Sequence, residues 1–269
     1  MWRMSVHWLA AAAAALALPA APPSPPGLTP GAIYAGASVQ PDSASRFPFP
    51  ATLRLTADAR RVDAVSFAER YACPSGDSFT DRVGLADMPI KPDGRFGKVK
   101  RFGGTTITVS GQVGPTVASF LVSARDQDDC KALTGFRVLR GADVYGGAGS
   151  DDYPATLQLA PSRRSIEQLV VFLVASCTDV QKLPLTYRAP VRLTRIAVAA
   201  DGAFAAHGTY GYRYGSSGTQ VSVVYTVRGR LGRTAAQGAL AFTVGGAYRN
   251  GAKLFEGCRG TVVWRAESA

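Results

Sequence analysis

The sequence Pro50-Ala51-Thr52-Leu53-Arg54-Leu55 occurs a second time, with one change, as Pro154-Ala155-Thr156-Leu157-Gln158-Leu159. Both copies lead to a cysteine after the same interval, Cys73 (50 to 73) and Cys177 (154 to 177). At the same offset, Arg60 matches Arg164, Val62 matches Ile166, Asp63 matches Glu167 and Val65 matches Leu169. Self-similarity at a fixed offset is typical of tandem duplication. We therefore expect two structural units of one kind.

The composition is that of a folded protein with a basic surface. The chain has 269 residues, of which 46% are hydrophobic and 18% charged, so it is long enough for two domains. Its 30 Lys and Arg against 19 Asp and Glu give a net charge of +11, which favours an anionic polymer as partner. No run of five basic residues occurs. We do not expect nucleic acid as the ligand, and a coding bias towards basic residues is the alternative explanation.

The N-terminal segment has the pattern of a secretory signal peptide. Arg3 precedes an apolar run from Trp8 to Leu18, and the small residues Ala20 and Ala21 follow. We predict a signal peptide over residues 1–21 with cleavage near Ala20, and a Pro-rich linker over 22–30. The apolar run is shorter than the roughly 20 residues that span a bilayer. We expect a secreted protein with no transmembrane segment in the mature chain.

The four cysteines fall two per repeat. Cys73 and Cys130 lie in the first unit, and Cys177 and Cys258 in the second. Four cysteines allow three pairings, and duplication selects the pairing within each unit. Disulfides are expected in an oxidising compartment. The close C-x-x-C spacing of zinc sites is missing from the sequence, and we expect neither a metal nor a cofactor.

The pattern of the two repeats, 31–141 and 144–267, is that of β-strands separated by turns. Apolar residues alternate with polar ones, and Asp93-Gly94 and Asp201-Gly202 mark turns in equivalent places. We predict all-β architecture: two tandem antiparallel β-sandwich (or small barrel) domains with one intradomain disulfide each. The later strands are predicted at Phe96–Phe102, Thr105–Val113, Val117–Ala124 and Phe136–Arg140, and at Phe204–Tyr214, Thr219–Leu231, Ala239–Val244 and Thr261–Trp264.

Two strand positions depart from simple alternation. The segment Leu169–Ala175 is apolar on both faces, so we expect it to be covered on both sides, against the neighbouring domain. Glu69 interrupts the apolar face of the equivalent strand, where its duplicate is Leu173. An inward carboxylate is costly unless it is paired. A bulge or an edge position, where Glu69 meets an arginine or water, is the favoured interpretation, and a buried functional acid is the alternative.

Candidates for catalysis are few. Downstream of the signal peptide the only histidine is His207, whose place in its strand predicts that it faces solvent. A carboxylate hydrolase using Glu69 and Glu167 remains an alternative, because glycosidases need only two acids. The acidic stretch Asp126-Gln127-Asp128-Asp129 and the pair Asp151-Asp152 contain oxygen ligands for calcium, but they fit no EF-hand spacing. Solvated loops are the favoured interpretation for both.

Two equivalent hairpins carry the candidate binding residues. The first contains Lys98, Lys100 and Arg101, which are suited to anionic groups, and the second contains Tyr210, Tyr212, Arg213 and Tyr214. The alternative is that the tyrosines extend the core face and that the lysines form a solvated face.

Several short motifs recur in the same order in both units. They are Tyr-x-Gly (Tyr34-Ala35-Gly36, Tyr145-Gly146-Gly147), a strand ending in Cys, Asp-Gly-x-Phe, Val-x-Gly (Val109-Ser110-Gly111, Val227-Arg228-Gly229), a late Cys and a closing strand. This order resembles the small secreted β-sandwich domains with one disulfide found in exported proteins of high-GC Gram-positive (actinobacterial-type) bacteria. The first unit departs from the pattern at Phe136-Arg137-Val138, where the second has Trp264. The resemblance implies fold and location but no activity.

The sequence thus predicts a secreted, non-catalytic binding module acting at or outside the cell envelope. Its expected partner is an anionic glycan or a protein. The alternatives are an exported carboxylate-dependent hydrolase and a structural or inhibitor-type protein.

Overall fold

The computed structural model describes residues 27–39, 48–76, 78–179, 181–214, 219–249 and 252–269. In these ranges the chain forms β-strands and no α-helix, gathered into two antiparallel sheets. The first sheet consists of β1 (Ile33–Ser38), β2 (Pro50–Leu55), β3 (Arg61–Ala72), β4 (Ser78–Pro89), β5 (Arg95–Phe102), β6 (Thr105–Val113), β7 (Val117–Arg125) and β8 (Lys131–Leu139). The second consists of β9 (Val144–Gly149), β10 (Pro154–Leu159), β11 (Ser165–Asp179), β12 (Pro184–Leu193), β13 (Ile196–Ala197), β14 (Ala203–Tyr214), β15 (Thr219–Leu231), β16 (Ala235–Arg249) and β17 (Ala252–Ser268).

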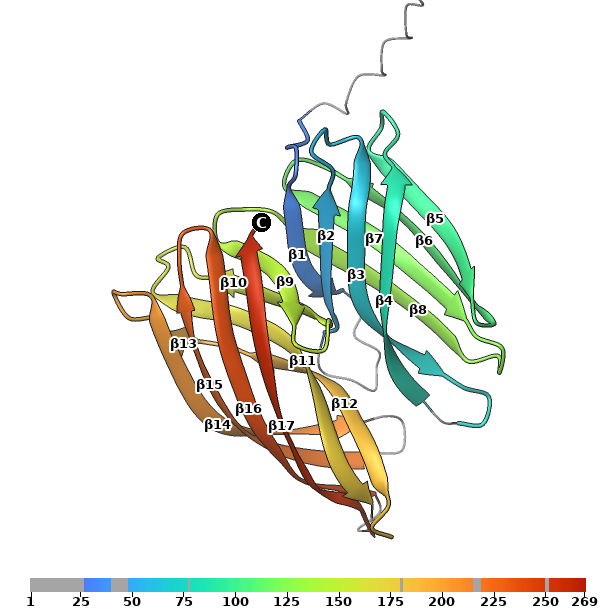
Figure 1. Ribbon diagram of the computed structural model, residues 1–269, viewed down its shortest axis with the longest axis vertical. Helices are drawn as coiled ribbons and strands as arrows, with labels where there is room; N and C mark the ends of the chain where they lie inside the picture. Colours follow the sequence, from blue (N-terminus) through green and yellow to red (C-terminus); the bar gives the residue numbers. More distant parts are fainter. Residues whose placement is uncertain (1–26, 40–47, 77, 180, 215–218, 250–251) are drawn as a thin grey trace, which may run out of the picture.

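Each sheet curls into a small barrel, and most of its strands pair with the strand that precedes or follows them in the chain (Figure 1). In the first barrel (β1–β8) the strand order is β4-β3-β2-β1-β8-β7-β6-β5, so β1 and β8 join the two halves. The second barrel (β9–β17) repeats this order, with β9 and β17 as the joining strands. The all-β prediction is therefore confirmed, and of its two forms the small barrel is the one observed.

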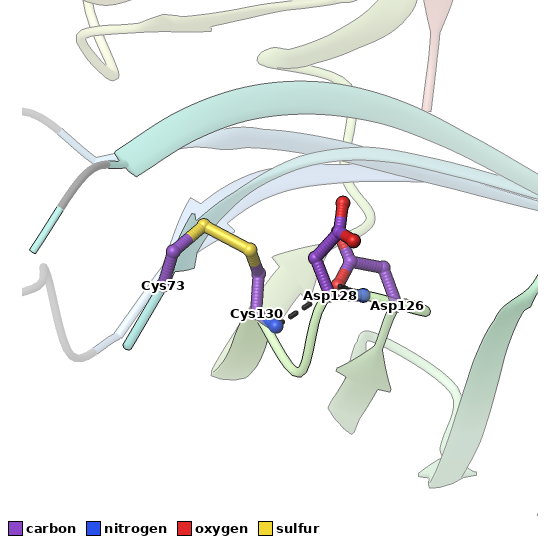
Figure 2. The surroundings of a disulfide bond; sticks show 4 residues. All are labelled: Cys73, Asp126, Asp128 and Cys130. Atoms are coloured by element: carbon purple, nitrogen blue, oxygen red, sulfur yellow. Dashed lines mark hydrogen bonds between the residues drawn. A yellow bond between two sulfur atoms is a disulfide. The ribbon is translucent and has the colours of Figure 1, made fainter. Parts of the chain in front are cut away.

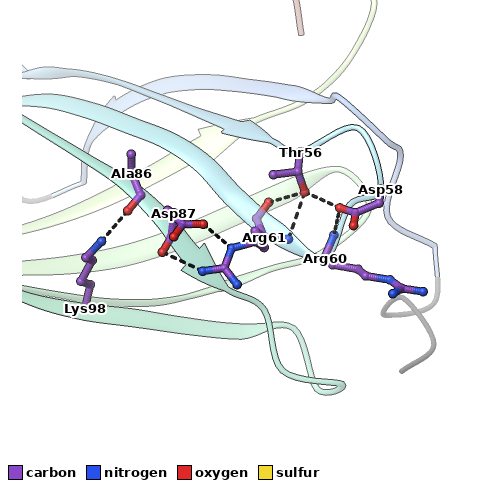
Figure 3. Close-up of polar contacts among 7 residues, drawn as sticks. All are labelled: Thr56, Asp58, Arg60, Arg61, Ala86, Asp87 and Lys98. Atoms are coloured by element: carbon purple, nitrogen blue, oxygen red, sulfur yellow. Dashed lines mark hydrogen bonds and ion pairs between the residues drawn. The ribbon is translucent and has the colours of Figure 1, made fainter. Parts of the chain in front are cut away.

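The first barrel has an open side between β4 and β5. These strands stand at opposite ends of the strand order, so no hydrogen-bonded ladder joins them. Their connecting turn closes with hydrogen bonds from Lys91 N to Arg95 O (2.8 Å) and from Gly94 N to Lys91 O (2.8 Å). Farther along, the ammonium group of Lys98 donates to the carbonyl oxygen of Ala86 across the gap at 2.7 Å (Figure 3). The Lys98 side chain thus bridges β5 to β4.

Each disulfide holds together two strands that meet beyond the end of a short hairpin. The hairpin β1–β2 is shorter than β3, so β3 reaches past it and pairs directly with β8, as Ala72 with Lys131. Cys73 and Cys130 are joined next to this pair. Likewise β11 pairs directly with β17, and Cys177–Cys258 links them. The predicted cysteine pairing is confirmed.

The tyrosine and glycine of the repeated Tyr-x-Gly motif have separate structural roles. Tyr34 and Tyr145 are fully buried, and their hydroxyl groups donate to the carbonyl oxygens of Gly114 (2.8 Å) and Gly232 (3.0 Å). The glycine, Gly147 in the second barrel, lies where a Cβ atom would come within 1.9 Å of the carbonyl oxygen of Arg265. The motif therefore fastens a turn to each barrel and allows the joining strands to approach closely.

The Asp-Gly-x-Phe and Val-x-Gly motifs act as a pair. Phe96 lies directly across the strand pair from Gly111, and Phe204 from Gly229. A Cβ atom at Gly111 would lie 2.7 Å from Cζ of Phe96, and one at Gly229 would lie 2.4 Å from Cζ of Phe204. Because glycine has no side chain, it leaves room for the ring of its cross-strand partner. Such aromatic–glycine pairs fix the register of the two strands.

The two barrels pack through equivalent strands, with β1 and β2 of the first against β9 and β10 of the second (Figure 1). Phe172 of β11 belongs to the hydrophobic core of the first barrel, together with Tyr153, whose ring stacks on it at 4.0 Å. The partly buried Val174 packs against the same core. The prediction that Leu169–Ala175 is covered on both faces is confirmed. The described part of the chain contains no helix with the length and apolar character needed to cross a membrane.

Candidate functional site

The basic residues of the first predicted hairpin lie on β5, beside the open side of the first barrel. Lys98 is half-buried by its bond to Ala86, whereas Lys100 and Arg101 are exposed. The ammonium group of Lys100 lies 5.3 Å from the centre of the Phe102 ring. Figure 3 shows that Lys98 lies apart from the Arg61–Asp87 ion pair of the neighbouring strands. Of the three, Lys98 has a structural contact and the other two remain available to a ligand.

Of the candidate residues on the second predicted hairpin, Tyr210 is the one whose side chain the structure describes. Tyr210 is partly buried, packs on the second core and lies 5.9 Å from the ring of Tyr225. Burial raises its pKa above the ordinary value for tyrosine. The side chains of Tyr212, Arg213 and Tyr214 lie outside the described residues. His207 is exposed, as predicted.

Glu69 occupies a different environment from the one favoured on sequence grounds. It lies neither at a bulge nor beside an arginine: its side chain is 0% exposed inside the first barrel, and its described hydrogen bond comes from the hydroxyl of Tyr71, at 3.0 Å. Successive side chains of β3 alternate between the two faces of the sheet, and this alternation places the Glu69 carboxyl on the core face. Glu167 is exposed on β11, and no hydrogen bond or ion pair among the described residues joins the two acids. The two acids lie in different barrels, Glu69 on β3 and Glu167 on β11.

The acidic stretch before Cys130 builds a turn. One carboxylate oxygen of Asp126 accepts hydrogen bonds from the backbone N–H groups of Asp128 and Cys130, both at 2.9 Å (Figure 2). Asp129 forms ion pairs with Arg125 (2.6 Å) and Lys131 (3.4 Å). Across the described ranges, no group of three or more Asp, Glu, His or Cys side chains is arranged to hold a metal ion. This stretch therefore positions the cysteine for its disulfide.

The outer surface of the second barrel carries a cluster of arginines that the sequence reasoning missed. Successive side chains on a strand alternate between faces, so Arg228 and Arg230 of β15 both point outward. Arg230 pairs across the sheet with Gln237 of β16, and Gln237 pairs with Arg265 of β17. We call the surface formed by Arg228, Arg230, Gln237 and Arg265 the arginine face.

These side chains surround an open hollow of about 710 Å³. Its floor includes the small side chains of Ala148 and Ala239 and the exposed side chain of Val263. Arg230 is paired with Asp201 at 3.0 Å. Within the described residues, Arg228 and Arg265 have no carboxylate partner within ion-pair distance. Two exposed guanidinium groups are thus left to interact with solvent or a ligand.

The first barrel provides an internal comparison for this surface. The row Arg230, Gln237, Arg265 corresponds to Gln112, Ser119, Arg137 of the first barrel, and Arg228 corresponds to Ser110. One arginine therefore stands where the second barrel has three. The cluster belongs to one copy only, so the shared fold does not require it.

Comparisons with known proteins assign the chain to no family. No protein-family model and no curated protein sequence matches it. A proposed outer membrane protein of Bacteroides fragilis matches with 10% identity over 89% of this chain and 97% of its own, at a TM-score of 0.25. A protein of unknown function from Nostoc punctiforme, of the DUF3598 family, has 9% identity, coverages of 90% and 96% and a TM-score of 0.22. Kievitone hydratase from Nectria haematococca has 6% identity, 91% coverage of each chain and a TM-score of 0.22. These similarities are too low to support an argument about function.

Proposed function

We propose that this chain is an exported, non-catalytic binding protein that holds an anionic glycan on the arginine face of its second barrel. The observation that carries the proposal is the pair Arg228 and Arg265, exposed guanidinium groups that have no carboxylate partner in the described ranges and lie beside one apolar floor.

The chemistry of the arginine face suits carboxylate, sulfate or phosphate groups. The planar guanidinium group binds such anions through two parallel hydrogen bonds. Arg228 and Arg230 are two positions apart on one strand, roughly 7 Å, and Arg230 and Arg265 are two strands apart, roughly 10 Å. An open surface with this spacing favours a polymer with repeated anionic groups over a small molecule that needs an enclosed pocket.

The expected location agrees with such a ligand. The two disulfides are typical of proteins outside the cytoplasm. The predicted signal peptide, residues 1–21, lies outside the described residues. An exported protein with this surface would meet the acidic glycans of a cell envelope.

The proposal is tested by binding to polygalacturonate and to dextran sulfate at several salt concentrations. We expect the variant Arg228→Gln with Arg265→Gln to bind about tenfold more weakly, equivalent to about 1.4 kcal/mol. This estimate follows because an exposed ion pair contributes about 0.2–1 kcal/mol. Binding by the wild-type protein should weaken as salt rises.

Two variants serve as controls. Arg137→Gln removes the equivalent of Arg265 from the first barrel and should bind within twofold of wild type. Replacing Lys98, Lys100 and Arg101 by alanine tests the hairpin predicted from the sequence. Loss of binding in that triple variant alone would move the site to β5. If the wild-type protein bound neither polymer, the proposed function would be wrong.

A further inference from the structure

Among the residues that the structure describes, Glu69 is an acid whose carboxyl is buried in the core of the first barrel. It is fully buried, and its Oε1 accepts a hydrogen bond from the Tyr71 hydroxyl at 3.0 Å. Its other oxygen, Oε2, is also buried and has no hydrogen-bond partner among the described residues. A buried carboxylate with a free oxygen is costly, whereas a protonated carboxyl is much less so.

The groups around Glu69 do not compensate a negative charge. On β4, Asp81 is its cross-strand partner, and like charges in that position destabilise a sheet. Asp126, from the turn after β7, adds a negative potential at Tyr71. The lysines of β5 are engaged elsewhere, Lys98 with Ala86 and Lys100 beside Phe102. No arginine or lysine of the described residues forms an ion pair with Glu69.

The second barrel shows that the fold does not need this acid. The pair equivalent to Glu69 and Asp81 is Leu173 and Ala189, which are both apolar and buried. The first barrel therefore has two acidic residues at the positions where the second barrel has two apolar core residues.

The strand next to Glu69 is an end strand of its sheet. β4 stands at the end of the strand order, and its ladder joins it to β3 alone. β3 is held to β8 by the Cys73–Cys130 disulfide and by its direct pairing. The Ser78–Val83 half of β4 pairs with β3, including the Tyr71–Phe79 ring stack at 4.7 Å. It meets the second barrel at the exposed ion pair of Arg82 with Asp152, at 3.8 Å, which contributes little to stability.

We infer that Glu69 is a pH-sensitive switch: while its carboxyl is protonated, the Ser78–Val83 half of β4 stays packed on β3, and ionisation releases it. An ionised Glu69 needs water, and separation of this edge segment is the shortest route by which water reaches it. The disulfide keeps β3 in place, so the opening is local. This inference is independent of the arginine face, which lies on the other barrel.

The direction of the pH effect follows from the pKa. Burial raises the pKa of Glu69 from 4.5 to about 7, Asp81 adds to the increase, and the bond from Tyr71 opposes it. A raised pKa means that the closed form holds its proton more tightly than the open form. Closure is therefore favoured fully below about pH 4.5 and is lost as pH rises through about 7.

The first test is direct titration of the mature wild-type protein labelled with ¹³C at the glutamate carboxyl carbons. The chain has four glutamates, Glu69, Glu167, Glu256 and Glu267, so four signals are expected. One should titrate near pH 7 and disappear in Glu69→Gln. A Glu69 signal that titrates near pH 4.5 would overturn the inference.

The second test is amide hydrogen exchange of residues 78–83 at pH 5 and pH 8.5, corrected for the intrinsic effect of pH. The local opening constant of the wild type should rise on the order of 100-fold. It should change by less than about threefold in Glu69→Gln, which keeps an acceptor for Tyr71, and in Glu69→Leu, the residue of the second barrel. Glu167→Gln, an exposed control, should behave as wild type. If the Glu69 variants retained the wild-type pH dependence, the switch would lie elsewhere.

Discussion

Gly147→Ala is expected to lower the free energy of unfolding of the second barrel by about 3 kcal/mol or more. The added Cβ atom would lie 1.9 Å from the carbonyl oxygen of Arg265 and 2.6 Å from Cα of Ala266. Both neighbours are backbone atoms, so no change of rotamer can relieve the overlap. β9 would have to move away from β17, its partner at Ala266, and the joining ladder of the barrel would be lost.

Urea unfolding followed by tryptophan fluorescence measures this effect. Trp264 is fully buried in the second barrel, and the other two tryptophans, Trp2 and Trp8, fall in the predicted signal peptide. Gly245→Ala is the matched control, because this exposed residue of β16 lies in the same barrel and the nearest atom to its Cβ position, the carbonyl oxygen of Ser222, is 3.8 Å away. It should change stability by less than about 1 kcal/mol. Equal stability of the two variants would show that the strands have room for a side chain at Gly147.

Removal of either disulfide is expected to cost about 4 kcal/mol in the chain-entropy description. The bonds close loops with sequence separations of 57 residues, Cys73–Cys130, and 81 residues, Cys177–Cys258. Each also fixes the direct pairing of two long strands beyond a short hairpin. The barrels should therefore lose stability separately rather than together.

Each double alanine variant serves as the control for the other. Trp264 reports on the second barrel, so its unfolding midpoint should fall strongly when Cys177 and Cys258 are replaced and much less when Cys73 and Cys130 are replaced. Hydrogen exchange of β3 and β8 should show the opposite order. Peptide mapping that found a bond between the two halves of the chain would contradict the predicted pairing.

Turn and strand signals in the sequence predicted the turns and several strand bounds, but they did not predict the length of the last strand. β6 has the predicted bounds, Thr105–Val113, and Asp93-Gly94 forms the predicted turn. The last strand was predicted as Thr261–Trp264, but β17 runs over Ala252–Ser268. Gly257 and Gly260 lie inside β17, where long neighbours on both sides supply enough pairing to keep glycines within a strand.

The sequence alone did not predict the arginine face, because its residues come from strands that are far apart in the chain. The alternation of β15 places Arg228 and Arg230 on one face, which the sequence does indicate. Arg265 is far along the chain, and only the order β15-β16-β17 puts it in the same row. The predicted hairpin residues were chosen because they are close in sequence, whereas a sheet brings together residues that are not.

The sequence by itself determined the duplication, the all-β class and the disulfide pairing, because each depends on repeated spacing along the chain. It also marked Glu69 as an anomaly on a core face. Tertiary structure alone decided that the strands form barrels, that Glu69 is buried without an arginine, and that three arginines of the second copy share one surface. Alternation specifies which face a side chain occupies, but only the completed sheet specifies what lies opposite.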